Sequence, residues 1–76
     1  MTYSLIIKRE CADPQYVLNI RRWVDVLDYL RDKLDQWTIG VHIYKYSSND
    51  RLLGERYVTM GNLWEVANSL TDKILL

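Results

Sequence analysis

Residues 38–60 have the sequence TIGVHIYKYSSNDRLLGERYVTM, which carries the clearest structural signal of the chain, the pattern of a β-hairpin. Apolar side chains at Ile39, Val41 and Ile43 alternate with other residue types, and this period of two indicates a strand buried on one side. The turn-forming segment 47–50 follows, and RLLGERYVTM supplies a partner strand after a loop of four or five residues. We therefore expect an antiparallel hairpin whose three alternating apolar residues face the core.

The segment before the hairpin predicts one strand and one long helix. TYSLIIKRE is rich in β-branched and aromatic residues, which predicts a strand over Thr2–Arg9. Asp13 followed by Pro14 has the form of a helix N-cap with proline at the first helical position. Apolar residues then recur at alternating spacings of four and three, which predicts a helix from Pro14 to Gln36. These residues are Tyr16, Ile20, Trp23, Leu27, Leu30, Leu34 and Trp37.

The first part of this predicted helix has an alternative interpretation. YVLNI, residues 16–20, also has the composition of a short strand that would pair with the first strand as a hairpin. In that arrangement Asn19 would cap a shorter helix. The sequence alone leaves both arrangements open for residues 15–20.

The C-terminal segment predicts a second helix. Asn62 and Glu65 have the spacing of a capping box, and an apolar stripe follows. The stripe consists of Leu63, Val66, Ala67, Leu70 and Ile74. The predicted order is β-α-β-β-α, with both helices packed on one face of the sheet. We thus expect a small two-layer α+β domain that covers residues 1–76 as a single unit.

Composition argues against several classes of function. Ten basic residues balance ten acidic ones, whereas a general phosphate-backbone binder normally has a basic excess. Cys11 is the only cysteine and His42 the only histidine, so one chain cannot assemble a Cys/His zinc site. Neither residue has an evident activating neighbour, and Asp28 with Asp32 lacks further metal ligands in the sequence. We expect no enzyme activity, no cofactor and no bound metal.

The same features predict where the protein is found. A single cysteine allows no intramolecular disulfide, which favours a reducing compartment. No apolar run approaches the ~20 residues of a membrane-spanning helix. We expect a cytoplasmic protein that does not insert into membranes.

An acidic line on the predicted long helix is the first candidate surface. It consists of Asp25, Asp28, Asp32 and Asp35, spaced three, four and three residues apart. Such a line faces water when the apolar stripe is packed, and its like charges repel each other weakly. It is compatible with mimicry of a phosphate backbone, but also with an ordinary solvated helix face on which Arg21 and Arg31 pair with the aspartates.

The uncovered sheet face is the second candidate surface, and we expect it to bind a protein partner. If Val41 faces the core, alternation turns His42, Tyr44 and Tyr46 the other way, with Tyr57 and Glu55 beside them on the partner strand. Exposed tyrosines in one patch are typical of protein interfaces. Trp64, at the edge of the second helix's stripe, is a further candidate anchor or a boundary packing residue.

These features predict a non-enzymatic module that binds an unidentified partner protein by occupying its surface. In its size, neutral charge and lack of catalytic motifs the chain resembles, in type only, the small inhibitors encoded by phages and mobile elements, anti-CRISPR proteins among them; this resemblance transfers no residues. One alternative is a small nucleic-acid-binding domain that stacks bases on the tyrosines, with Lys45, Arg51 and Arg56 near the phosphates. Another is a homodimeric structural component that self-associates through the tyrosine face.

Overall fold

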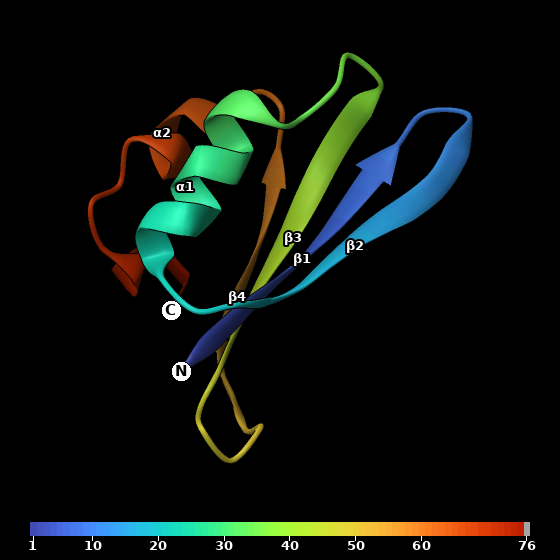
Figure 1. The fold of residues 1–76 in the computed structure, drawn as a ribbon. Helices are drawn as coiled ribbons and strands as arrows, with labels where there is room; N and C mark the ends of the chain where they lie inside the picture. The colour runs from blue at the N-terminus through green and yellow to red at the C-terminus, as the bar shows by residue number, and fades with distance from the viewer. Residues whose placement is uncertain (76) are drawn as a thin grey trace.

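Four antiparallel strands form one sheet in the computed structural model, which describes residues 1–75 (Figure 1). The strands are β1 (Thr2–Arg9), β2 (Ala12–Ile20), β3 (Thr38–Tyr46) and β4 (Leu52–Thr59), in the spatial order β2-β1-β3-β4. β1 and β3 are central, and β2 and β4 are the two edges. The predicted first strand and the predicted hairpin are confirmed.

Three helical segments cover one face of this sheet. They are α1 (Trp23–Asp32), the short α2 (Leu63–Ala67) and a 3-10 turn, η1 (Asp72–Leu75). Figure 1 shows α1 and α2 side by side on one side of the sheet, with the chain after α2 returning below them. The two-layer α+β class is thus confirmed. Within residues 1–75, no helix combines the length and the apolar character that crossing a bilayer requires.

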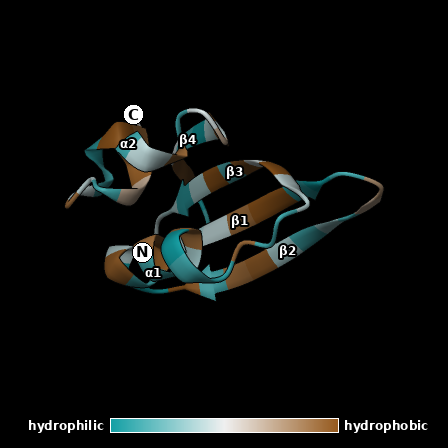
Figure 2. Cartoon of the chain, turned by 90° about the horizontal axis from the view of Figure 1, so that it is seen from above, coloured by the Kyte–Doolittle hydropathy of each residue, from teal (hydrophilic) through white to brown (hydrophobic). Residues whose placement is uncertain are grey.

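The hydrophobic core lies between the sheet and the helices. Alternate residues of β1 point into it, as expected for a strand with one buried side. Figure 2 shows this alternation as bands of hydrophobic and hydrophilic residues along the strands. The buried apolar residues are Tyr3, Leu5, Ile7, Val26, Leu27, Leu30, Val41, Ile43, Val58, Val66, Ala67 and Leu75.

The predicted long helix from Pro14 to Gln36 is wrong, and the alternative with a strand at YVLNI is closer. β1 turns back at Cys11, whose φ of 59° places it in the left-handed region, and β2 pairs antiparallel with β1. Pro14 is tolerated because β2 is an edge strand with one neighbour, where a missing N–H costs no ladder bond. Asn19, with φ 62°, lies in β2 and does not cap α1, whose N-cap is Arg22.

The apolar stripe that suggested the long helix is therefore divided among three elements. Leu27 and Leu30 belong to α1 and are buried. Tyr16 lies on β2 and is 62% exposed, and Trp37 lies in the loop before β3 and is 53% exposed. The four-three spacing over residues 16–37 was thus accidental at both ends, since it joined residues that pack in different places.

The prediction that Ile39 faces the core is also wrong. Lys8 pairs with Gly40 and Arg9 pairs with Thr38, so Ile39 is an extra residue with no partner on β1. Such a β-bulge interrupts the alternation of side chains along the strand. Ile39 is 50% exposed as a result, while Val41 and Ile43 are completely buried as predicted.

The second helix begins after Asn62 as predicted but ends sooner. Asn62 makes no side-chain capping bond, so the predicted capping box is not formed. Two carbonyls at the end of the helix accept bonds from α1: Arg31 donates to the Ala67 oxygen and Trp23 to the Ser69 oxygen. Leu70, predicted to continue the buried stripe, lies beyond the helix and is 87% exposed.

Candidate functional site: an aromatic sheet face

The sheet face opposite the helices carries a row of large side chains that crosses all four strands. Strand register places Tyr16 of β2 beside Ile6 of β1, Ile6 beside His42 of β3, and His42 beside Tyr57 of β4. Directly opposite residues of an antiparallel pair point to the same side of a sheet. We call this side the open face; its members are Ile6, Lys8, Tyr16, Leu18, His42, Tyr44, Tyr46, Glu55 and Tyr57.

Aromatic rings stack along β3 on the open face. The His42 and Tyr44 ring centroids are 4.3 Å apart and the planes are inclined by 8°. Tyr46 continues the stack at 6.3 Å from Tyr44, and Tyr57 meets His42 edge-on at 5.9 Å. Stacked and edge-to-face contacts of this kind are favourable between aromatic rings, so each ring restricts its neighbours. Rings that already pack against each other lose less conformational entropy when a partner binds.

Few charges lie on this face, and those present are engaged with the rings or with each other. His42 Nε2 lies 3.3 Å from Glu55 Oε1. Lys8 Nζ lies 5.3 Å from the centroid of the Tyr57 ring, the arrangement of a cation–π contact. The centre of the open face is therefore apolar and aromatic, with a polar margin.

Exposure is greatest at the two edges of the row. Tyr16 is 62% exposed, Leu18 62% and Tyr57 41%, while Ile6 and the β3 rings between them are half-buried. Contiguous apolar surface of this kind is uncommon on a monomer unless it has an interaction to make. At one end of the open face, Leu18 and Tyr46 border a shallow hollow that Thr2 and Ser4 also line.

Gly40 makes room for one ring of this face. A Cβ atom at position 40 would lie 2.0 Å from the Tyr57 hydroxyl oxygen and 2.6 Å from its Cζ, so the ring of Tyr57 lies across the bare backbone of β3. Any side chain at position 40 must displace that ring. A strand glycine often marks such a close approach.

Gly40→Ala is accordingly expected to move the Tyr57 ring and to cost about 1 kcal/mol of stability in the wild-type background. In a Tyr57→Ala background the same change should cost nothing or be slightly stabilising, since the obstruction is gone. Urea unfolding of the four proteins of this double-mutant cycle measures the coupling. Equal costs in both backgrounds would contradict the close approach of Tyr57 to Gly40.

The predicted site residues are brought together in part. His42, Tyr44, Tyr46, Glu55 and Tyr57 share the open face as the alternation of the hairpin required. Sequence reasoning missed Ile6, Tyr16 and Leu18, which extend the face across β1 and β2. The sequence did contain a signal for Tyr16 and Leu18, namely the alternative strand at residues 16–20. Two residues that are two positions apart share a face in a strand.

Two of the three basic residues proposed as phosphate ligands lie on the opposite side of the sheet. Lys45 Nζ contacts Asp72 Oδ2 at 2.7 Å, under the helical layer. Arg56 donates to the Ile74 carbonyl oxygen and pairs with Glu65. Arg51 lies in the turn between β3 and β4 and is exposed. Lys45 and Arg56 are therefore not placed to bind the phosphates of a strand stacked on the tyrosines.

The predicted acidic line is interrupted in the structure. Asp25, Asp28 and Asp32 lie on α1, but Asp35 lies beyond its end and faces Arg9, with which it forms an ion pair at 3.4 Å. Asp35 Oδ1 also accepts bonds from the Trp37 amide and the Thr38 hydroxyl, which orders the loop into β3. Asp35 is a loop-forming residue, and the helix was predicted too long at this end.

The arginines near the acidic line also pair differently from the expectation. Arg22, and not Arg21, binds Asp25 through two contacts of 3.0 Å, and these bonds lower the pKa of the Asp25 carboxyl. Arg31 is turned towards the Ala67 carbonyl and pairs with neither Asp28 nor Asp35. Within residues 1–75, no group of three or more Asp, Glu, His or Cys side chains has the geometry of a metal site.

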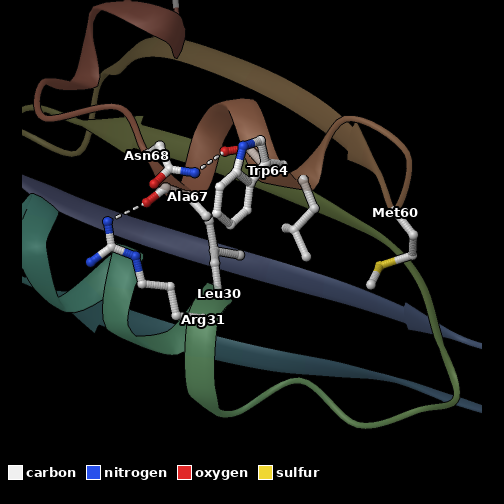
Figure 3. Close-up of a pocket in the computed structure, with 7 residues that line it drawn as sticks. Leu30, Arg31, Met60, Trp64, Ala67 and Asn68 are labelled. Carbon is white, nitrogen blue, oxygen red and sulfur yellow. Dashed lines mark hydrogen bonds between the residues drawn. The ribbon is translucent and has the colours of Figure 1, made fainter.

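Trp64 lies far from the open face, on the outer surface of α2. Its side chain is 78% exposed and borders a groove between α1 and α2 (Figure 3). Trp64 is thus not a boundary packing residue of the core. It belongs to a second surface, on the helical side of the molecule.

Cys11 is exposed in the β1–β2 turn.

Comparison of the chain with known protein families, with curated proteins and with solved structures found no match. The geometry of the molecule is therefore the basis for the function proposed below.

Proposed function

We propose that this protein is a non-enzymatic binding module that occupies the surface of a partner protein with its open face. The observation that carries the proposal is the row from Tyr16 to Tyr57, which joins all four strands into one aromatic and apolar surface. Tyrosine suits such a role because it offers a large contact area and a polar hydroxyl at a low cost in conformational entropy. Binding inhibits any partner whose activity needs the covered surface.

The charge distribution favours a protein partner over a nucleic acid. Binding to a phosphate backbone depends on several basic residues along its path. On the open face Lys8 lies over the Tyr57 ring, and Glu55 on the edge strand β4 places a negative charge at the margin of the stack. Lys45 and Arg56 lie on the opposite side of the sheet, where they contact Asp72 and the Ile74 carbonyl oxygen. A largely apolar protein surface with a polar rim complements this face better.

The proposal predicts that capture of the partner depends on the exposed ends of the row. We expect a Tyr16→Ala/Tyr57→Ala variant to retain less than about a tenth of the partner captured by the wild type, since a few large aromatic side chains carry most of the energy of an interface. The measurement is affinity capture from a lysate in which the protein is expressed, quantified by mass spectrometry. Far-UV circular dichroism and thermal unfolding establish that each variant is folded.

Trp64→Ala is the matched control, because it removes a larger and more exposed aromatic side chain from the other side of the molecule. The partner lost by the Tyr16/Tyr57 variant should be retained by this control. Retention by both variants would contradict the proposal. Loss of the captured protein after nuclease treatment would also contradict the proposal, because it would assign the face to nucleic-acid binding. So would a dimer in light scattering that depends on the open face and occurs without any other partner, because it would assign the face to self-association.

A further inference from the structure

A shallow hollow lies at the end of the open face that adjoins the turn between β3 and β4. It has a volume of about 300 Å³ and is lined by residues of three strands and of this turn, namely Thr2, Ser4, Leu18, Asn19, Tyr46 and Asp50. Thr2 and Ser4 belong to the central strand β1, where they alternate with buried residues and therefore point to the open face. Their small side chains leave space between the larger Leu18 of β2 and Tyr46 of β3.

The hollow is lined by one negatively charged residue and by no positively charged one. The negatively charged residue is Asp50, which is exposed. Among the residues that the structure describes, its carboxylate forms no ion pair. Its neighbours in the turn, Asn49 and the cation Arg51, do not line the hollow. The charge of Asp50 is therefore available to a cationic group of a partner.

The other polar groups of the hollow are available in the same way. Within the described part of the chain, no hydrogen bond engages the side chains of Thr2, Ser4, Asn19 and Tyr46. Their hydroxyl and amide oxygens can accept bonds from a ligand that carries several N–H groups. Leu18 and the ring of Tyr46 add apolar surface for a hydrocarbon stem. The hollow thus combines a negative charge, several acceptors and an apolar wall.

We propose that this hollow binds an arginine side chain of the partner protein. The inference rests on the function proposed above, because Leu18 and Tyr46 belong to both the hollow and the open face. A guanidinium group is planar and permanently charged, its N–H donors point in several fixed directions, and it stacks on aromatic rings. Lysine has a compact ammonium group that cannot stack in this way, and an acidic side chain would meet the like charge of Asp50.

The test uses three small probes at matched ionic strength: N-acetyl-arginine amide, N-acetyl-lysine amide and N-acetyl-citrulline amide. Citrulline has nearly the shape of arginine but no charge. ¹⁵N-labelled protein is titrated with each probe, and the backbone amide signals of Thr2, Ser4, Asn19 and Asp50 report on the hollow. We expect the arginine probe to shift these signals with saturation and to bind at least about five-fold tighter than the citrulline probe. It should also bind tighter than the lysine probe.

Asp50→Asn is the decisive variant, because it removes the charge and nearly keeps the shape. Asparagine is one of the residues that readily adopt a positive φ such as the 60° of position 50, so the turn is expected to be retained. We expect this variant to bind the arginine probe about five-fold more weakly than the wild type. Asp32→Asn makes the same charge change on α1, on the other side of the sheet, and should leave the affinity unchanged.

The proposal is overturned if the arginine probe does not shift these four signals, or if either other probe binds as tightly. Wild-type affinity in Asp50→Asn would overturn it as well, and so would equal weakening in Asp50→Asn and Asp32→Asn. The titration needs no partner protein, whereas the open-face proposal is decided by affinity capture with the Tyr16→Ala/Tyr57→Ala variant. Failure of one proposal is therefore distinguishable from failure of the other.

Discussion

Ile43→Ala is expected to lower the free energy of unfolding by about 3 kcal/mol, a large part of the total for a domain of this size. Ile43 is completely buried at the centre of β3, between its partners on β1 and β4. Its truncation removes three carbon atoms from contact with the core and leaves a cavity that the sheet backbone cannot fill by collapsing. Urea or thermal unfolding followed by circular dichroism measures the loss.

Ile39→Ala is the matched control for this prediction, since it changes the same residue type on the same strand. Simple alternation makes positions 39 and 43 equivalent, but the bulge leaves Ile39 half exposed. We expect its loss to cost less than about 1 kcal/mol. Similar costs at the two positions would show that the bulge is absent and that alternation continues along the whole strand.

Asp72→Ala is expected to cost about 2–4 kcal/mol, the second large effect. The Asp72 carboxylate accepts a bond of 2.5 Å from the Tyr3 hydroxyl and lies 2.7 Å from Lys45 Nζ. The side chains of Lys45 and Asp72 are only 17% and 21% exposed, so removal of the carboxylate leaves a half-buried ammonium without its counter-ion. This cluster fixes η1 to the sheet. Asp32→Ala, at an exposed position on α1, should leave stability nearly unchanged.

The same cluster predicts how stability depends on pH. The hydrogen bond from Lys45, supported by that from Tyr3, lowers the pKa of Asp72 in the folded state. The stability it contributes is therefore present above the unfolded pKa near 4 and is lost as pH falls through the lower folded value. Burial, with the Asp72 bond, raises the pKa of Tyr3. The stability that protonated Tyr3 contributes is therefore fully present below its unfolded pKa, about 10, and is lost as pH rises through the higher folded value.

Unfolding curves of the wild type and of Asp72→Ala, measured between pH 2.5 and 11 in steps of about one unit, test this linkage. The variant should lose the part of the acid-side decline that Asp72 causes, and its alkaline decline should be smaller. Parallel stability curves for the two proteins would contradict the coupling of Asp72 to Lys45 and Tyr3.

Local sequence patterns predicted the segments whose neighbours lie nearby in the chain. β3, its turn and β4 form one hairpin, so the alternation of Val41 and Ile43 and the turn residues after Tyr46 were sufficient to place it. Thr2–Arg9 was likewise evident from its composition. The α+β class followed because amphipathic helices need a sheet face to cover, whatever their lengths.

The error at residues 14–36 arose because β2 depends on pairing that the pattern does not show. Tyr16 and Ile20 fit both a helical stripe and a strand, and propensity does not choose between them. Pairing with β1 selects the strand for residues 12–20, because without β2 the strand β1 would be an edge of the sheet with unpaired backbone groups. The turn at Cys11 requires a left-handed conformation that a non-glycine residue rarely adopts, so no turn signal marked it.

The open face was predicted only in the part that lies on the hairpin. His42, Tyr44 and Tyr57 were placed together because β3 and β4 are adjacent in sequence and in space. Tyr16 and Leu18 join them through β1, and this contact follows from the strand order of the sheet. The sequence was sufficient to place the residues of the hairpin on one face. The strand order of the sheet was needed to show that this face continues across all four strands.

The most direct test of the open face as a protein-binding surface is photo-crosslinking in cells. p-Benzoylphenylalanine is introduced in place of Tyr57, in place of Tyr16, and as a control in place of Asn49 in the exposed turn before β4. Our account predicts that positions 57 and 16 crosslink to the same protein on irradiation and that position 49 does not. Crosslinks to nucleic acid, crosslinks only between copies of this chain, or none at either tyrosine position would contradict it.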